Sequence, residues 1–518
     1  MSAVNEKRTI GIAAVIWGAS MLLSRVVGVV REAVVGRVLG SGPEADIYQS
    51  AFYLPNFLGY LLAGGAVSMV FIPMYARYLR EDDEAGGWRL FSTLATTLGT
   101  ALAVLIPLFM LAVPALAAVV VPEFQGDKLD SWIRVTRIAL PAQAFHVLGG
   151  LLSAVLQARD KHMLPAFANL GYAGGIILFG AVLGPSMGPE AFLWGVLVGS
   201  ILGPFGLPLI GCLREGLKFR PRWDFTHPDL RRYLWLTFPI MLAFSVVFFD
   251  DILSGHFASG DDGLIAQLGY GKTLMKVPMG VFGLAVASAA FPTLTRLVSA
   301  GKPHQAYETL IHSGRQMLVL AFATQAAFTV AASQVAEVIW GTERFPQPVL
   351  DQIGLYTGLY CLGLGGWAAN NLLARGFYAQ QKTWVPSFLG SAVVLVCYPL
   401  YWFLFRELGG NGIAIASSIA ITLYTILLAI LLRRSMAGAD APALWTLVIR
   451  MVPAVLLGIA AGYGIDQVLS LPALLQGAIT GSVAMTLTLA LGHLFGVPEV
   501  RETAGILWGK VARKLGRA

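Results

Sequence analysis

The chain has 518 residues, of which 56% are hydrophobic and only 13% are charged, and its formal net charge is +7. This composition excludes the ordinary soluble classes and predicts a protein that crosses a membrane several times. The basic residues are dispersed over the connecting segments, so the positive charge does not indicate a nucleic-acid partner.

Apolar runs of roughly 18 to 28 residues recur along the chain, and each can cross a hydrocarbon core of about 30 Å as an α-helix. We count about fourteen such runs, so the expected fold is an all-α integral membrane protein. No connection between them is long enough for a soluble domain. The runs centre near residues 20, 62, 105, 144, 174, 202, 244, 282, 320, 362, 395, 423, 455 and 485.

The two ends of the chain are expected on the cytoplasmic side. The first apolar run lacks a small-residue cleavage site, so we interpret it as a retained span rather than a signal peptide. With the N-terminus inside, about 24 of the 36 Lys and Arg residues lie on cytoplasmic segments and about five on the opposite side. This bias predicts cytoplasmic N- and C-termini.

Two pairs of segments resemble each other at nearly the same offset. AVSMVFIP (66–73) resembles AVASAAFP (285–292) at an offset of 219, and QARDKHMLPAF (157–167) resembles YAQQKTWVPSF (378–388) at 221. Six predicted spans, an even number, separate the copies, so both copies should have the same orientation in the membrane. Chance similarity between apolar segments is the alternative interpretation.

The repeat predicts two six-helix bundles followed by two more helices. We place the N-terminal bundle at 1–215, the C-terminal bundle at 216–435, and the two additional helices with a basic tail at 436–518. A transport pathway would lie between the bundles, where such repeats usually have their midplane site.

The first span carries charges that need a partner. In LLSRVVGVVRE (22–32), Arg25 and Arg31 are expected in the outer half of the membrane, where an ionised group usually marks a pathway or a paired site. We predict that both arginines bind substrate in an aqueous cavity. The alternative is an outer interfacial turn that includes Arg31, Glu32 and Arg37, with Arg25 reaching toward it.

The second span, 45–73, combines an acid with helix-disrupting residues. Asp46 is at its outer end and is a candidate substrate-binding residue, and a proline follows within the span. Proline removes a backbone donor, and a glycine pair loosens the helix, so we expect a bend here. We assign gating to Asn56, Gly64 and Gly65; for the glycines, close packing between helices is the alternative.

The seventh and eighth spans carry a second charged group. Asp250 and Asp251 are adjacent in one span, and Lys272 and Lys276 are four residues apart on one face of the next. We predict that the lysines bind substrate and that the aspartates act in charge coupling as their counter-charges. His146, by contrast, is expected to be a hydrogen-bonded core residue.

Several motifs resemble one known family. The segments SRVVGVVRE (24–32), ADIYQSAFYLPNFL (45–58), GGAVSMVFIP (64–73) and LMKVPMGVFGLAVASAAFPTL (274–294) resemble the MurJ (MviN) family of lipid II flippases, within the MOP exporter superfamily. The likeness covers essentially the whole chain. It implies functional roles for Arg25, Arg31 and Asp46, and export of an undecaprenyl-diphosphate-linked peptidoglycan precursor by alternating access in the bacterial cytoplasmic membrane.

The chain departs from that family pattern at several charged positions. Where basic residues often follow Leu-Pro-Asn, this chain has Gly59 and Tyr60, and Gly64 stands where an acid is common. Thr273 replaces a typical arginine of the eighth span, and Lys276 replaces an acid. The cavity charge is therefore rearranged.

We predict a transporter and not an enzyme. The main hypothesis is a lipid II flippase; the alternatives are a flippase for another lipid-linked oligosaccharide and a cation-coupled multidrug antiporter. A membrane glycosyltransferase using the Asp pairs 82–83, 250–251 and 261–262 is disfavoured, because the first and last pairs fall on opposite sides of the membrane. The cysteines have no metal-ligand or disulfide spacing and should be apolar packers: Cys212, Cys361 and Cys397.

No cofactor or metal is expected, and transport would draw on the membrane potential or on a monovalent cation. The expected partners are the lipid-linked peptidoglycan precursor and membrane lipids, with the cell-wall synthesis machinery as a further candidate and no nucleic acid.

Overall fold

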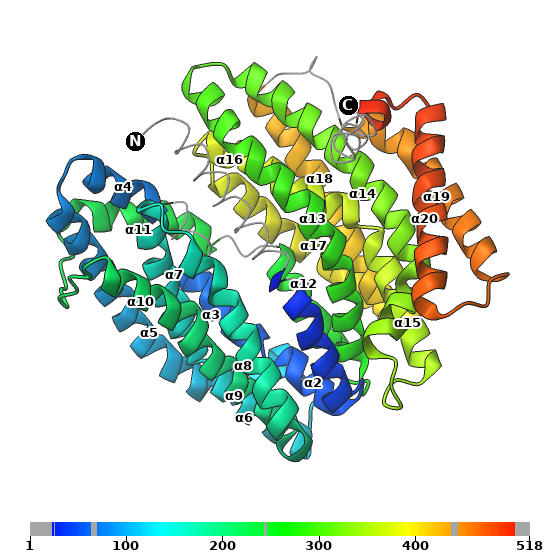
Figure 1. Ribbon diagram of the computed structural model, residues 1–518, viewed down its shortest axis with the longest axis horizontal. Coiled ribbons are helices and arrows are strands. Elements are labelled where there is room, and N and C mark those ends of the chain that lie inside the picture. The colour runs from blue at the N-terminus through cyan, green and yellow to red at the C-terminus, as the bar shows by residue number, and fades with distance from the viewer. Residues whose placement is uncertain (1–22, 25, 64–69, 243–245, 437–443, 503–518) are drawn as a thin grey trace, which may run out of the picture. The chain divides into compact units, whose positions relative to one another are not determined.

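The computed structural model describes residues 23–24, 26–63, 70–242, 246–436 and 444–502 (Figure 1). Within these ranges every regular element is a helix, as the composition predicts. Nine of the described helical segments are long and apolar enough to cross a membrane. The all-α membrane fold is therefore confirmed, whereas the number fourteen stays a prediction.

The chain divides into two units. The first consists of Met1–Phe244 with Ala258–Ala266, and the second of Ser245–Phe257 with Gln267–Ala518. The connection between two helices of the second unit therefore belongs to the first. The sequence predicted three parts with other boundaries, on the basis of the internal repeat. That division stays a prediction.

The helices of the first unit follow a helical segment at 26–39. They are α2 (Pro43–Ser50), α3 (Tyr53–Ala63), α4 (Ile72–Arg80), α5 (Glu84–Val120), α6 (Gly126–Ala139), α7 (Ala142–Ala158), α8 (Met163–Met187), α9 (Pro189–Ser200), the π-helix η2 (Ile201–Gly206), α10 (Leu207–Arg214) and α11 (Pro228–Leu242).

The second unit contains the remaining helices, and its last two, α19 and α20, pack on α14 (Figure 1). Its helices are α12 (Val246–Ala258), α13 (Leu264–Ser299), α14 (Pro303–Trp340), α15 (Gln347–Cys361), α16 (Leu364–Ala379), α17 (Trp384–Leu408), α18 (Gly410–Met436), α19 (Trp445–Asp466) and α20 (Ala473–Leu494). The first residues of α13, through Ala266, belong to the first unit.

The two segments that resemble each other at the offset of 221 also share local backbone structure. Helices α8 and α17 both have 25 residues and begin 221 positions apart. Asp160 and Gln381, at the same offset, both have φ 60°, an uncommon conformation for residues other than glycine. Gly188 and Gly409, again 221 apart, end the two helices with φ 58° and 57°. Similar sequences thus impose the same turn before, and the same glycine after, each helix.

The predicted bend in the second span is present as a break. Helix α2 ends at Ser50, and α3 starts at Tyr53. Pro55 lies in the first turn of α3, where its missing N–H costs nothing, and its ring would clash with the carbonyl of Ala51 in a continuous helix. Gly64 and Gly65, the other two predicted gating residues here, lie outside the described residues.

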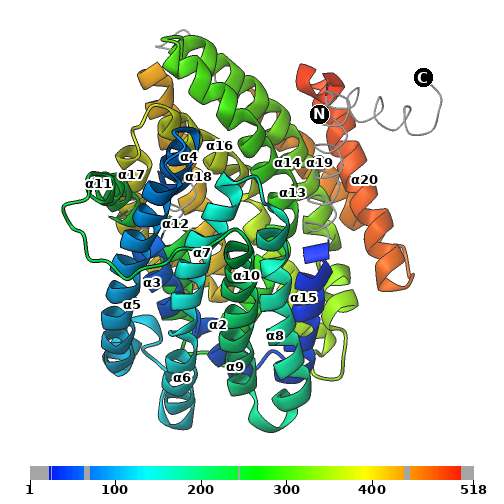
Figure 2. The same ribbon diagram turned by 60° about the vertical axis from the view of Figure 1, so that its left-hand side comes forward.

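Glycines bring α8 and α9 into close contact, and the two helices lie side by side (Figure 2). A Cβ added at Gly175 would come within 2.6 Å of the Cα of Gly199 and 2.7 Å of the Gly195 carbonyl oxygen. Gly171 of α8 makes a similar contact one turn along with Gly203 of η2, the helix that follows α9. Small residues let membrane helices approach in this way. The approach sets the positions of the side chains that these helices present to the site below.

Replacing Gly175 with alanine should force α8 and α9 apart. We expect Gly175→Ala to lower the free energy of unfolding by roughly 1–3 kcal/mol, because the new methyl group meets backbone atoms that cannot rotate away. The control is Gly174→Ala, at an exposed neighbouring position where an added Cβ meets nothing within 4 Å. Thermal unfolding in detergent would measure both variants, and equal melting temperatures would contradict the close contact.

Candidate functional site

Arg31 is partly buried and paired with its neighbour in sequence. Its Nη2 and Nε donate to Oε1 of Glu32 at 2.6 and 3.2 Å. Arg37 is exposed. Arg25, the other predicted first-span cation, lies outside the described residues. Of the three cations in this span, the structure thus distinguishes Arg31, which is held by a carboxylate, from Arg37, which faces outward.

Asp46 is fully buried and its carboxylate accepts three hydrogen bonds. Pro43 starts α2 at the position where a fixed φ suits a helix, and this short helix carries Asp46 inward. Oδ1 accepts from the backbone N–H of Ala266 at 2.9 Å. Oδ2 accepts from the N–H of Gly263 at 2.7 Å and from Nζ of Lys128 at 3.2 Å.

These bonds make Asp46 a cap for the start of α13. The first N–H groups of a helix have no partner within it, and the helix dipole favours a negative charge there. Asp46 supplies that charge from a position more than 200 residues earlier in the chain. In this conformation Asp46 therefore attaches the 258–266 segment to α2, and its oxygens are already engaged.

Lys128 was not predicted to belong to the site. Lys128 lies in the first turn of α6, and its ammonium bridges Asp46 and Asp262. The distance from its Nζ to Oδ1 of Asp262 is 2.7 Å. The ammonium also lies 4.2 Å from the ring centroid of Phe124. Since Lys128 is separated from both acids by more than 80 residues, no spacing rule could have indicated the contact.

A second charged cluster lies within the second unit. Lys272 on α13 contacts Asp250 on α12 and donates to Oδ1 of Asp251 at 2.5 Å. The Tyr401 hydroxyl on α17 donates to the other oxygen of Asp250. Lys272 and Asp250 are both buried. The predicted counter-charge is thus present as an ion pair, while the proposed role of these residues in transport stays a prediction.

The positions of the helices explain how two consecutive acids share one lysine. Asp250 and Asp251 are consecutive, yet both carboxylates reach one ammonium, because Lys272 approaches from a neighbouring helix on a flexible stem. The Tyr360 ring lies 5.8 Å from that ammonium. A buried charge of either sign would be costly alone, so the three ionisable groups stabilise one another. Lys276, one turn further along, is exposed.

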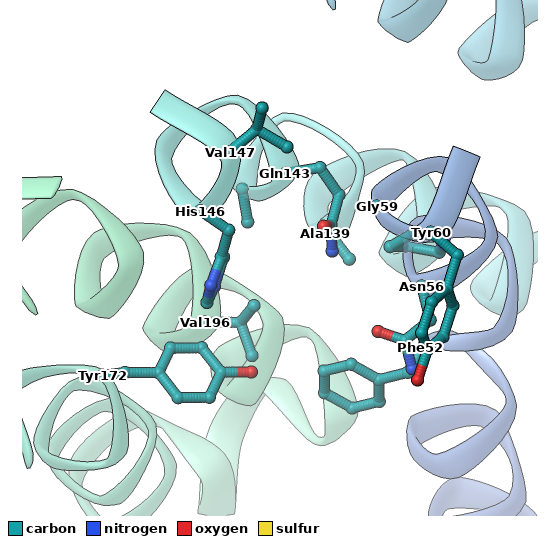
Figure 3. Close-up of a pocket in the computed structure, with 12 residues that line it drawn as sticks. Phe52, Asn56, Gly59, Tyr60, Ala139, Gln143, His146, Val147, Tyr172 and Val196 are labelled. Carbon is teal, nitrogen blue, oxygen red and sulfur yellow. The ribbon is translucent and has the colours of Figure 1, made fainter. Parts of the chain in front are cut away.

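A cavity of about 360 Å³ lies inside the first unit (Figure 3). Asn56, Gly59 and Tyr60 line it from α3, so one predicted gating residue and two of the positions that depart from the family pattern occur together. Figure 3 shows the side chains of Gln143 and His146 from α7 and Tyr172 from α8 facing the same space. The remaining lining residues are Phe52, Pro55, Ala139, Ala142, Val147 and Val196.

His146 is hydrogen-bonded, as predicted, but it is not simply a core residue. Its Nε2 lies 2.9 Å from Oγ of Ser200, whose hydroxyl donates to the Val196 carbonyl. The His146 ring packs edge-on against Tyr172 with centroids 5.1 Å apart. His146 therefore forms part of the wall of a polar cavity.

The described helices and their buried charges define a polytopic membrane protein. A solved structure described as "Lipid II flippase MurJ, inward closed conformation" superposes with a TM-score of 0.74 at 18% identity, covering 93% of this chain and 98% of that one. A multidrug resistance MATE family transporter of the MOP superfamily gives 0.66 at 15% identity, covering 82% and 98%.

Sequence comparison gives the family. The family model described as "Lipid II flippase MurJ" matches residues 35–475. A probable lipid II flippase MurJ of Rhizobium tropici is 28% identical over 413 residues, covering 78% of this chain and 77% of the relative. The lipid II flippase MurJ of Burkholderia cenocepacia is 27% identical, covering 80% and 82%. The chain belongs to the MurJ family, and it is a multi-pass protein of the bacterial inner membrane.

Removing the carboxylate of Asp46 should release the 258–266 segment. We expect Asp46→Ala to speed amide hydrogen exchange in this segment, because the N–H groups of Gly263 and Ala266 lose an acceptor worth roughly 1–3 kcal/mol. Exchange measured by mass spectrometry on the detergent-solubilised protein would test this. Asp262→Ala is the matched control, since it removes the other acid on Lys128 and leaves both backbone bonds. Equal exchange in the two variants would contradict the capping role.

Proposed function

We propose that this protein moves lipid II, the undecaprenyl-diphosphate-linked peptidoglycan precursor, from the inner to the outer leaflet of the cytoplasmic membrane. The observation that carries the proposal is the family match over residues 35–475, together with relatives named lipid II flippase that align over about four fifths of the chain. Peptidoglycan synthesis, and through it cell shape, would depend on this step. The protein would act by transport, without covalent chemistry.

The cationic residues suit the head group of such a cargo. A diphosphate needs donors that keep their charge, and the planar guanidinium of arginine provides them. Glu32 occupies Nε and Nη2 of Arg31, which leaves further N–H donors of the same group for a phosphate oxygen. We assign substrate binding to Arg31 and, from the sequence, to Arg25.

Alternating access would require the bonds of Asp46 to break. These bonds attach the 258–266 segment to α2. Any movement of this segment away from α2 during transport has to separate the carboxylate from Gly263 and Ala266. A cargo diphosphate that competes for Lys128 would weaken the attachment. Asp46 would then act as a gate residue that responds to substrate, in addition to any direct contact with it.

We propose that both termini are cytoplasmic, on the basis of the distribution of Lys and Arg. Energy would come from the membrane potential or from a monovalent cation, with no bound cofactor. Membrane lipids surround the protein, and the cell-wall synthesis machinery is the partner we propose for handing on the cargo. The function requires no nucleic acid.

A flippase for another lipid-linked oligosaccharide is the second candidate. The observation in its favour is the neutral character of Gly59 and Tyr60, which line the cavity where the family often has basic residues, and of Thr273. A cation-coupled drug antiporter is less well supported, because the buried lysine and the arginines suit an anionic cargo better than a cationic drug.

Arg31→Ala should reduce flipping by about tenfold or more, since a charge-assisted bond to phosphate contributes roughly 1.5–3 kcal/mol. Arg25→Ala should do the same. Arg37→Ala is the control, because Arg37 is exposed on the same helical segment, and it should leave the rate within about twofold. The assay is transport of lipid II across proteoliposomes at matched protein levels. Equal losses in all three variants would favour the interfacial interpretation.

Replacing Lys272 and Lys276 with alanine should eliminate both flipping and cargo crosslinking, if the lysines bind the diphosphate. Lys272 also neutralises Asp250 and Asp251, so its loss alone should destabilise the protein by roughly 3–5 kcal/mol. Asp250→Asn with Asp251→Asn should keep crosslinking and change the transport rate or its energy coupling.

A compensated variant separates the two roles of Lys272. Lys272→Met combined with Asp250→Asn and Asp251→Asn removes all three charges together and should recover most of the lost thermal stability. We expect flipping to stay lost in this variant. Recovery of flipping together with stability would show that Lys272 is structural and does not bind cargo.

A further inference from the structure

The cavity within the first unit contains polar groups but no ion. None of the twelve described residues that line it is an Asp, Glu, Lys or Arg. Its volume of about 360 Å³ falls within the range of roughly 300–1,000 Å³ that is usual for small-ligand sites. Such a site is suited to one small molecule or to one chemical group of a larger one.

Two amides in this cavity are available for a ligand. The side chains of Asn56 and Gln143 make no hydrogen bond to another part of the described chain, and Figure 3 shows Gln143 extending into the space across from Tyr172. Gln143 lies directly over Gly59, where an added Cβ would come within 2.6 Å of its Oε1. The absence of a side chain at Gly59 therefore creates the room that the Gln143 amide occupies.

The depth of the cavity makes these unused polar groups significant. Tyr172 is nine residues into α8, or about 14 Å along the helix axis, and α8 is one of the candidate membrane spans. Polar side chains at such depth usually face a partner or a functional cavity, because lipid offers them no hydrogen bond. Asn56 is exposed and Gln143 is partly buried, so both amides face the open space of the cavity and can reach a ligand there.

The chemistry of the lining favours a neutral ligand. A diphosphate or carboxylate would meet no Lys or Arg side chain among the residues that line the cavity. A hydrocarbon chain would leave both amides without partners, at a cost for each. The lining favours a neutral group that offers donors and acceptors, which amides match on both counts, together with an apolar face for the Phe52 ring.

We propose that this cavity binds an N-acetylated sugar ring of the transported lipid, through Asn56 and Gln143. The proposal rests on the proposed function, in which the cargo is a lipid-linked glycan, and it gives the neutral part of that cargo its own site. Hydroxyl and acetamido groups would pair with the two amides, and the C–H face of the ring would lie against Phe52. His146 completes the wall, with Nε2 held toward Ser200.

The cavity is linked to the helix that carries Asp46. Tyr48, also on α2, packs edge-on against Phe52 with ring centroids 5.2 Å apart. A sugar ring seated on Phe52 would press on a residue two positions from Asp46. Binding of a sugar in the cavity would therefore act on Tyr48, a neighbour of the residue that attaches the 258–266 segment to α2.

The test uses the full-length purified protein and a soluble probe, di-N-acetylchitobiose. We expect saturation-transfer NMR to show the acetyl methyl groups in contact with the wild-type protein. Asn56→Leu with Gln143→Leu should weaken binding about tenfold, since it removes two neutral hydrogen-bonding groups. Gln157→Leu is the matched control on the same helix, outside the lining, and should bind as the wild type does.

A second variant controls for loss of binding that is caused by misfolding. Gly59→Ala removes no polar group and favours the helix, but its methyl group must displace the Gln143 amide, so it should also weaken binding. Cellobiose, which lacks the acetamido groups, should bind more weakly than the probe. Absence of probe binding to the wild type, unchanged binding in both cavity variants, or equal binding of cellobiose would overturn the proposal.

Transport of lipid II in vesicles is measured in parallel to keep the two proposals distinct. If the wild type transports lipid II but the cavity variants bind the probe as well as it does, the sugar site is wrong and the flippase function stands. If the wild type transports no lipid-linked glycan, the proposed function fails, and probe binding still decides whether the cavity recognises a sugar.

Discussion

Backbone N–H groups that have no partner within a helix need one elsewhere, and in the described structure several of them find it in side chains from distant segments. Asp46 shows this most clearly, because its carboxylate serves the unpaired N–H groups at the start of α13. The same constraint acts on the segment before α11, which forms no helix. Its N–H groups at Arg220 and Arg222 donate to hydroxyls of Ser92 and Thr96, one turn apart on α5.

Among the described residues of each unit, one lysine is shared between two carboxylates. Lys128 lies between Asp46 and Asp262, and Lys272 lies between the two acids of α12. In each cluster two acids face one ammonium, so an anionic cargo would compete with the acids for that cation. A charge cluster of this kind can be remade in a different conformation, which an apolar core of the same volume could not do.

The backbone features that recur at the offset of 221 and the charged clusters follow different patterns in the sequence. Turn residues and helix-ending glycines recur at the offset of 221, because the backbone of both copies needs the same conformations. The charged clusters do not recur in this way. The acids of α12 lie 22 and 21 residues before their lysine, whereas Lys128 lies 82 residues after Asp46. The two copies thus share a scaffold and differ in the chemistry attached to it.

The sequence by itself determined the all-α membrane fold, the break near Pro55 and the list of charged residues that needed explaining, because hydropathy, helix length and proline geometry act locally. Only the tertiary structure decided the partners. It showed that Asp46 caps a helix more than 200 residues away, that Lys272 reaches both aspartates while Lys276 stays exposed, and that a cavity lies over Gly59. Contacts between distant segments depend on how helices pack, and no local pattern records them.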